Sequence, residues 1–335
     1  MVWRELQLGQ KGTGAALRRP PRRPIHHPAA RWLAWGLLGL TLGAAPFVLS
    51  EYDLHTFNLV LVNVLLAVGL NLVVGVARQF ALSIGALFGV GAYVAALAQM
   101  RLGLPFLAAL PLAVAAATAV SAATSLVAWR AGGLYLAMIT FGFAEIFQFA
   151  LVHADALTNG PDGLAVPRPS VAGVTLATQA QIALLYLPLT AAAILAYRFM
   201  EVGRVGRVLT ALGDSEVALA SVGYSAPAAK TLAFAVQGAY AGLAGALYAG
   251  AIGYIDPYSF NLGVTLQQLT AIAIGGFGSL AGAVVGGAAL TLIERVVMDF
   301  AGLKEVAYGV ALLAVFLLLP DGLAGWLFRK RGTSA

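Results

Sequence analysis

The chain has 335 residues, of which 60% are hydrophobic and 10% are charged, and its mean hydropathy is +0.87. A soluble domain carries about 25% charged residues, so this composition excludes a soluble fold and indicates a membrane protein. The lack of cysteine excludes disulfides, thiolate metal sites and cysteine nucleophiles, and a net charge of +6 is more typical of membrane topology than of nucleic-acid binding.

The N-terminal region is polar, basic and rich in proline over residues 1–31, which predicts a disordered cytosolic tail. An apolar run follows at 32–50. A basic segment before an apolar run resembles a signal peptide, but this run is long, and Pro46 and Phe47 spoil the small-residue cleavage site after Ala44 and Ala45. We therefore expect an uncleaved membrane anchor.

Apolar runs near 20 residues recur along the chain, the length that a helix needs to cross a bilayer. Strand-like alternation is absent, so a barrel is not expected. We predict an all-α polytopic membrane protein with about ten transmembrane helices, in a domain at 32–328 followed by a basic cytosolic tail at 329–335. The predicted spans are 32–50, 56–76, 80–100, 105–128, 133–153, 181–199, 230–253, 262–278, 279–300 and 305–327. The glycine-rich pair at 262–300 leaves a re-entrant or broken helix open as an alternative.

Positive charge sets the expected orientation. Ten spans place both termini on one side, and with the N-terminus inside, 16 of the 20 Lys and Arg residues fall in cytosolic segments. The exceptions are Arg101, Arg168, Arg295 and Lys304. Because cytosolic loops carry the excess of Lys and Arg, we expect both termini in the cytosol.

A 28-residue polar stretch at 203–230 interrupts the apolar pattern. It carries Arg204, Arg207 and Lys230 but only two acids, Asp214 and Glu216. A polar segment of this kind on the cytosolic face suits binding by a soluble partner. The alternative is a loop that lies on the lipid headgroups.

Helix signals divide this stretch into two short helices joined by an elbow. Residues 203–212 form a helical run that we expect Gly213 to break. Asp214 is then the expected N-cap of a second helix, with Glu216 in the first turn, where the helix dipole favours an acid. Gly223 lies where a left-handed C-terminal cap is expected.

Glycine, of which there are 39, clusters at 85–93, 242–250 and 274–288. Without Cβ atoms helix backbones approach closely, which favours association in lipid. For any one glycine ordinary packing is the simpler interpretation. Taken together, the clusters indicate a bundle whose helices slide or rock, and the similar segments 82–93 and 274–286 hint at an internal repeat.

Catalytic motifs are absent: no H-E-x-x-H, G-x-S-x-G or P-loop sequence occurs, and no paired acids face each other within a span. We predict no catalytic residue, metal or cofactor. Glu145 is the one acid deep in a predicted span, and Gln148 follows at i+3. A carboxylate at that depth is either a pathway or gating residue or a protonated or hydrogen-bonded packing residue. Asn71 and Gln79 are further pathway candidates among intramembrane polar residues that are individually more often structural; the others are Ser83, Gln237, Gln267 and Gln268.

Several motifs resemble one family. Residues 70–93, LNLVVGVARQFALSIGALFGVGAY, resemble the signature of branched-chain amino-acid ABC transporter permeases, most closely the LivM type. Further matching segments follow in the family's order at 133–146, 158–164, 206–223, 233–249, 256–260, 274–288 and 319–326. The resemblance runs from about residue 57 to 328.

The resemblance implies a permease subunit in a bacterial inner membrane. Its expected partners are ATP-binding ABC subunits, a LivH-like second permease and a periplasmic solute-binding protein, with no nucleic acid. The polar stretch becomes the cytoplasmic coupling loop that docks into a groove of the ATPase. Glu216, Ala218 and Gly223 match the family's E-x-A…G pattern there, and Asp214 completes the coupling residues.

Some positions depart from the family's pattern. Arg78 stands where the family usually has Gly. Thr210, Gly213 and Ala220 stand where basic residues are common, and Leu219 replaces a usual Ala. The coupling loop therefore carries fewer positive charges than is common in the family.

Two other kinds of function stay open at this point. One is a secondary transporter driven by an ion gradient, with Glu145 as the proton site. The other is an ABC permease for urea or short amides, because close relatives of the family carry these solutes. An intramembrane enzyme is disfavoured, since no acid–base pair exists.

Overall fold

The computed structural model describes residues 46, 49–127, 129, 133–171 and 173–298, which belong to one compact unit, Ala45–Ala335. The predicted tails at 1–31 and 329–335 and the predicted span at 305–327 lie outside the described residues. So does most of the predicted anchor at 32–50.

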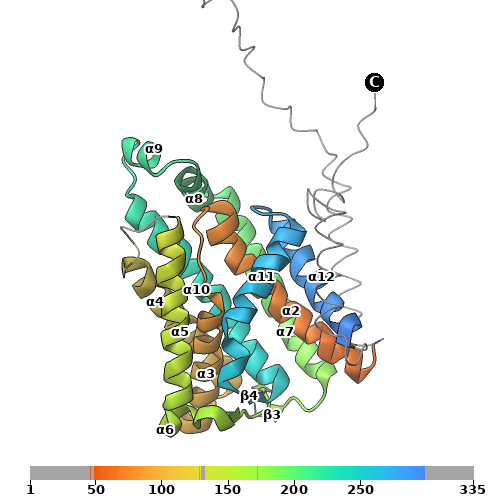
Figure 1. Ribbon diagram of the computed structural model, residues 1–335. Coiled ribbons are helices and arrows are strands. Elements are labelled where there is room, and N and C mark those ends of the chain that lie inside the picture. Colours follow the sequence, from red (N-terminus) through yellow and green to blue (C-terminus); the bar gives the residue numbers. More distant parts are fainter. Residues whose placement is uncertain (1–45, 47–48, 128, 130–132, 172, 299–335) are drawn as a thin grey trace, which may run out of the picture. The chain divides into compact units, whose positions relative to one another are not determined.

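Helices make up most of the described chain (Figure 1). The first helix, α2 (Glu51–Leu70), continues as a π-helix, η1 (Asn71–Val76). The longer helices that follow are α3 (Ile84–Leu102), α4 (Phe106–Val127), α5 (Leu134–His153), α7 (Gln179–Val202), α8 (Arg204–Asp214), α10 (Ala226–Ile252), α11 (Leu262–Gly275) and α12 (Leu280–Met298). The short ones are α6 (Asp155–Thr158), η2 (Gly160–Asp162), α9 (Glu216–Ser221) and η3 (Pro257–Phe260).

Four two-residue strands lie in the connections. β1 (Leu164–Ala165) pairs antiparallel with β4 (Tyr254–Ile255), and β2 (Ser170–Val171) pairs antiparallel with β3 (Val174–Thr175). In the first pair Leu164 lies opposite Ile255, so the connection between α6 and α7 is fastened to the C-terminal end of α10.

Six helices in the described ranges are long and apolar enough to cross a membrane. They are Glu51–Val76, Ile84–Leu102, Phe106–Val127, Leu134–His153, Gln179–Val202 and Ala226–Ile252. Each corresponds to one predicted span between 56 and 253, which confirms a polytopic helical membrane protein. The span predicted at 80–100 begins later, at Ile84, because the chain leaves the helix after η1 and Arg78 takes a left-handed conformation with φ of 51°.

The predicted span at 262–278 is shorter in the structure. α11 has 14 residues, about 21 Å of helix, against a hydrocarbon core of about 30 Å. Gly276 and Gly278, with φ of 107° and 75°, turn the chain back toward α12. α11 and α12 then pack so closely that a Cβ on Gly275 would collide with the carbonyl of Gly282. The short α11 therefore fits the alternative of a broken helix better than a full span, whereas α12 has 19 residues within the span predicted at 279–300.

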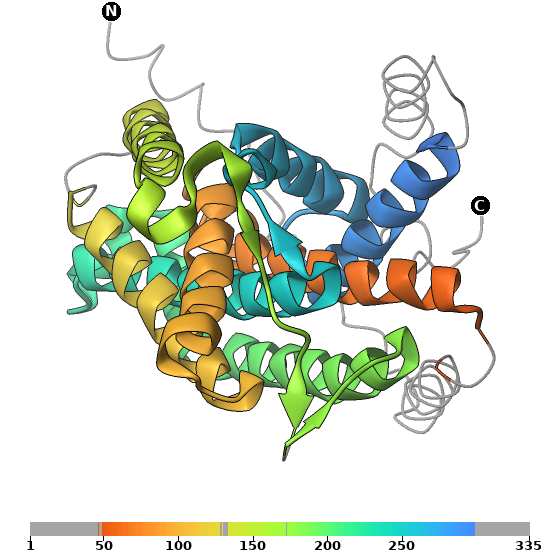
Figure 2. The ribbon, with the colours of Figure 1, turned by 90° about the horizontal axis from the view of Figure 1, so that it is seen from below.

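The core forms around α10, which packs against α4, α3 and α2. Glycine makes these approaches possible, since a Cβ on Gly91 of α3 would collide with the carbonyl of Gly242 on α10. Seen from below, α10 is enclosed by other helices, whereas α5 lies at the periphery of the described helices (Figure 2). The glycine clusters at 85–93 and 242–250 therefore serve close helix packing, as predicted.

The connections gather at the two ends of the helices. α8 and α9 lie at one end, while α6 and the short strands lie at the other (Figure 1). α8 contacts η1, the end of α7 and the beginning of α10. The end that carries α8 and α9 is therefore built from segments far apart in the sequence.

Candidate functional site

The predicted pair of short helices is present at 203–230. α8 follows α7 after Gly203, and α9 begins two residues after α8 ends. The elbow between them is Ser215, whose backbone is extended, with φ of −166° and ψ of 120°. This confirms the prediction of two short helices with an elbow.

The cap between the two helices was predicted at the wrong residue. α8 runs through Gly213 to Asp214, and the N-cap of α9 is Ser215, whose Oγ accepts a hydrogen bond from the Ala218 amide at 3.2 Å. Serine serves as an N-cap as well as aspartate does, so residue type alone does not choose Asp214 over Ser215. Asp214 instead closes α8 and pairs with Arg78 at 3.1 Å.

Gly213 does not break the helix; it allows a close approach. A Cβ at this position would lie 2.6 Å from the Val76 carbonyl oxygen and 3.2 Å from Cγ of Arg78. α8 therefore rests directly on the backbone where η1 ends. The sequence alone does not distinguish a glycine that permits close packing from a glycine that ends a helix, because the distinction depends on which segment packs against it.

Gly223 ends α9 as predicted, with φ of 85°. Its amide donates to the Ala220 carbonyl at 3.0 Å, and the Tyr224 amide donates to the Leu219 carbonyl at 3.3 Å. These two bonds form a Schellman cap. No atom lies within 4 Å of where a Cβ on Gly223 would be, so any cost of a side chain here is conformational.

Glu216 forms an ion pair with Lys230, Nζ to Oε1 2.8 Å, that fastens α9 to α10. Lys230 is the fifth residue of α10 and is only 3% exposed, whereas Glu216 remains exposed. The sequence had suggested Glu216 as the acid of a first turn and as a coupling residue, but not as a partner of Lys230. Because a lysine entering an apolar helix is rarely buried without a partner, Lys230 itself was the signal for this contact.

The outer surface of α9 and the chain after it combine apolar and polar groups. Ala218 is exposed, as are Val217, Val222 and Tyr224, while Leu219 is buried and anchors the helix. A groove of about 240 Å³ lies between α8 and α9. Its lining residues are Arg204, Arg207, Val208, Ala211, Leu219, Val222 and Tyr224. The surface thus offers two guanidinium groups beside an apolar patch.

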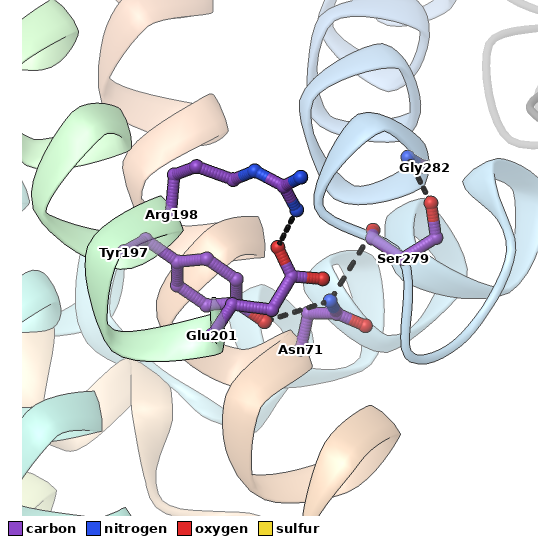
Figure 3. A network of polar contacts seen from close by, with 6 residues as sticks. All are labelled: Asn71, Tyr197, Arg198, Glu201, Ser279 and Gly282. Carbon is purple, nitrogen blue, oxygen red and sulfur yellow. Dashed lines mark hydrogen bonds and ion pairs between the residues drawn. The ribbon is translucent and has the colours of Figure 1, made fainter. Parts of the chain in front are cut away.

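Asn71, the first residue of η1, forms hydrogen bonds to α7 and to the turn between α11 and α12 (Figure 3). Its Nδ2 donates to the Tyr197 hydroxyl and to the Ser279 carbonyl, both at 3.3 Å, and its Oδ1 accepts from the Gly278 amide at 2.8 Å. Asn71 is fully buried, and these bonds join η1 to α7 and to the turn between α11 and α12. π-helical segments often mark functional sites.

The other intramembrane candidates lie apart from this network. Gln79 is buried, and its Nε2 donates to the carbonyl of Ala77, two residues earlier. Glu145 is exposed on α5, with Gln148 half-buried one turn later. Within the described part of the chain, no hydrogen bond or ion pair joins Glu145 to Asn71 or Gln79. The structure therefore does not bring the four candidates together at one site.

Residues 54–319 match the family described as "Branched-chain amino acid transport system / permease component". The chain belongs to this family. It is 28% identical over 304 residues to the high-affinity branched-chain amino acid transport system permease protein LivM of Escherichia coli (strain K12), covering 84% of this chain and 72% of that protein. The LivM protein of Salmonella typhimurium (strain LT2) is 27% identical over the same shares.

A second kind of permease is also similar to this chain. The permease protein LivH of Escherichia coli (strain K12) is 30% identical over 130 residues, covering 38% of this chain and 42% of that protein. No solved structure matches the chain. The family match includes η1, α8, α9 and the turn between α11 and α12, so every element of the candidate site lies inside the family region.

Proposed function

We propose that this chain is the LivM-like permease subunit of a bacterial ABC importer that moves branched-chain amino acids into the cytoplasm. ATP hydrolysis is supplied by separate ATP-binding subunits, a LivH-like permease completes the membrane part, and a periplasmic solute-binding protein delivers the solute. The similarity to two LivM proteins over 84% of the chain supports this function.

The proposed topology follows the charge distribution. The chain has about ten spans in a domain at 32–328, both termini in the cytosol, and basic tails at 1–31 and 329–335. Residues 203–230 face the cytosol as the coupling loop. Its three described arginine and lysine side chains then obey the positive-inside rule.

The observation that carries the coupling role is the double attachment of α8 and α9. Asp214 at the end of α8 pairs with Arg78 beyond η1, and Glu216 at the beginning of α9 pairs with Lys230 of α10. When the ATPase closes on ATP, it moves the exposed side of α9. The Glu216–Lys230 pair then passes that displacement to α10, the helix packed against α2, α3 and α4.

The second attachment leads to a different part of the core. α8 rests on the backbone of Val76 through Gly213, and η1 is joined by Asn71 to the turn between α11 and α12. A Cβ on Gly75 would collide with the Asn71 side chain and the Gly278 amide, so this junction is tightly packed. Asp214, Glu216, Ala218 and Gly223 are therefore proposed as coupling residues, with Asn71 at the point where movement reaches the α11–α12 hairpin.

Charge reversal tests the coupling role. Glu216→Lys and Lys230→Glu each place like charges together, so we expect loss of solute-stimulated ATP hydrolysis in reconstituted vesicles containing all subunits. The double exchange restores the pair and is expected to restore part of that activity. The matched control reverses the Arg198–Glu201 pair of α7, whose side chains are 49% and 29% exposed and lie 2.6 Å apart, and this reversal is expected to leave activity near the parent level.

The outcomes separate the possibilities. If both single reversals hydrolyse ATP and import leucine at the parent rate, α8 and α9 are a surface loop and the coupling role is wrong. Copurification of ATP-binding subunits with the parent chain tests the importer assignment itself. Competition of leucine uptake by isoleucine and valine, but not by urea or short amides, tests the solute class.

A further inference from the structure

Among the six described helices long and apolar enough to cross a membrane, α5 is the one that is turned outward with a charged residue in its middle. Its buried residues are Leu136, Ala137, Thr140, Ala144 and Leu151, all on one side. The opposite side, here called the outer face of α5, carries Tyr135, Met138, Glu145, Ile146 and Phe149, all of them exposed. Figure 2 shows α5 at the edge of the described helices. The exposure of these side chains shows that the other described elements do not cover this face.

The outer face is unsuited to lipid. Glu145 lies more than two helical turns from both Leu134 and His153, which places it deep in the span. The part of the chain that the structure describes offers it no hydrogen bond or ion pair. A carboxylate at that depth is costly in hydrocarbon and is normally directed at protein or water.

Within the described part of the chain, two further outward-facing spans, α4 and α7, lack this feature. α4 contains no charged residue, and in α7 the charged residues, Arg198 and Glu201, lie in its last two turns. Both helices expose large apolar side chains, such as Leu112 and Leu195, which suit lipid. The carboxylate distinguishes the outer face of α5 from these apolar surfaces.

We propose that the outer face of α5 binds the second permease subunit of the importer, and that Glu145 accepts a hydrogen bond from a donor on that subunit. The inference rests on the proposed function, which supplies three protein partners. Only the second permease spans the membrane, and only a membrane-spanning partner reaches a residue at the depth of Glu145. The ATP-binding and solute-binding proteins meet the chain outside the hydrocarbon.

The composition of the face fits a helix of such a partner. Met138, Ile146 and Phe149 supply apolar area around one acceptor, and Gly142 lies on the same side with no atom within 4 Å of where its Cβ would be. A glycine on an open face lets a neighbouring backbone approach, and a polar group opposite Glu145 fixes the register of the two helices. The second permease is therefore expected to present a hydrogen-bond donor among apolar residues.

Photo-crosslinking of the complete importer tests the surface. The chain has no native cysteine, so Phe149→Cys can carry a benzophenone maleimide, with Leu195→Cys on α7 as the matched control. We expect irradiation to join the position at 149, and not the position at 195, to the second permease, as identified by mass spectrometry. An adduct only to lipid or to another copy of this chain, or equal adducts from both positions, would overturn the proposal.

A second pair of variants tests the contact at Glu145. Glu145→Leu removes the acceptor, and the second permease copurified with the chain is expected to fall about three- to tenfold, as for loss of one interhelical hydrogen bond. Glu145→Gln keeps an acceptor and is expected to retain most of it. Unchanged copurification with Glu145→Leu would overturn the contact, even if import were lost.

Different results would contradict the proposed function and the role of the α5 face. If no ATP-binding subunit copurifies with the parent chain, the proposed function fails. If the ATP-binding subunits are present and active while position 149 gives no adduct to the second permease, only the assignment of the α5 face fails.

Discussion

The Arg78 guanidinium lies 3.1 Å from the Asp214 carboxylate, which joins the segment after η1 to the end of α8. Both side chains are exposed, and an exposed ion pair contributes only about 0–1 kcal/mol. The backbone of Arg78 is left-handed, with φ of 51°, and this conformation destabilises a non-glycine residue by about 1–2 kcal/mol. Stability therefore does not account for arginine here, and we infer that its position serves the contact with α8.

The neighbouring glycine makes this pair possible. Cγ of Arg78 lies 3.2 Å from where a Cβ on Gly213 would be, so a side chain at 213 would compete with the arginine for space.

Substitution at Arg78 separates strain from charge. Arg78→Gly and Arg78→Ala both remove the ion pair, but only glycine relieves the left-handed backbone. We expect the glycine variant to be more stable than the alanine variant by about 1 kcal/mol. Thermal unfolding in detergent measures the difference, and both variants are expected to show reduced solute-stimulated ATP hydrolysis. Equal stability of the two would contradict the strained conformation.

Adding one methyl group at Gly213 tests the close approach of α8 to η1. Gly213→Ala places a Cβ 2.6 Å from the Val76 carbonyl, and overpacking of this kind costs about 1–3 kcal/mol. α8 is expected to move away from η1, with lower thermal stability and weaker coupling to ATP hydrolysis. Thr210→Ala, in the same helix, is the control and is expected to be near neutral. Parent-level behaviour of Gly213→Ala would show that α8 does not need this contact.

Gly223 tests the cap of α9 by conformation alone. Gly223→Val forces a β-branched residue to φ of 85°, at a cost of about 1–3 kcal/mol, although the space around it is open. We expect normal membrane insertion but weaker copurification of the ATP-binding subunits. Asparagine tolerates the left-handed region, so Gly223→Asn is expected to retain most of the binding. The prediction fails if valine and asparagine behave alike.

The proposed topology places Thr175 in the periplasm and Ser221 in the cytosol. Since the chain has no cysteine, Thr175→Cys and Ser221→Cys provide single labelling sites. An impermeant thiol reagent applied to intact cells is expected to label the first variant only, and both after permeabilisation. Labelling of the second variant alone in intact cells would reverse the orientation.

The energy source is tested at Glu145. An ATP-driven importer is expected to keep transporting with Glu145→Gln, and to be insensitive to an uncoupler while ATP is maintained. Uptake of radiolabelled leucine into vesicles with enclosed ATP measures both. Collapse of uptake together with the proton gradient would instead support a proton-driven transporter with Glu145 as its proton site.

The sequence alone determined those properties that depend on solvent and on local backbone preference. Twenty-residue apolar runs predicted six described spans because the bilayer admits few other structures. The left-handed cap at Gly223 was also predictable, since glycine after a short helix satisfies the last carbonyls whatever surrounds it. The boundary between α8 and α9 was predictable to within one residue. Asp214 and Ser215 are equally good N-caps, and local preference does not choose between them.

The tertiary structure decided what depends on segments distant in the sequence. Glycine is a residue type that often ends a helix, yet Gly213 lies inside α8 with the Val76 backbone against it. Val76 is more than 130 residues away in the sequence, and only the fold brings the two together. The pairs Arg78–Asp214 and Glu216–Lys230 and the hydrogen bonds of Asn71 to the α11–α12 turn likewise depend on how helices pack. In lipid, helices associate through close surface fit rather than through hydrophobic burial. The fit depends on both contacting surfaces, so it cannot be read from the sequence of either segment alone.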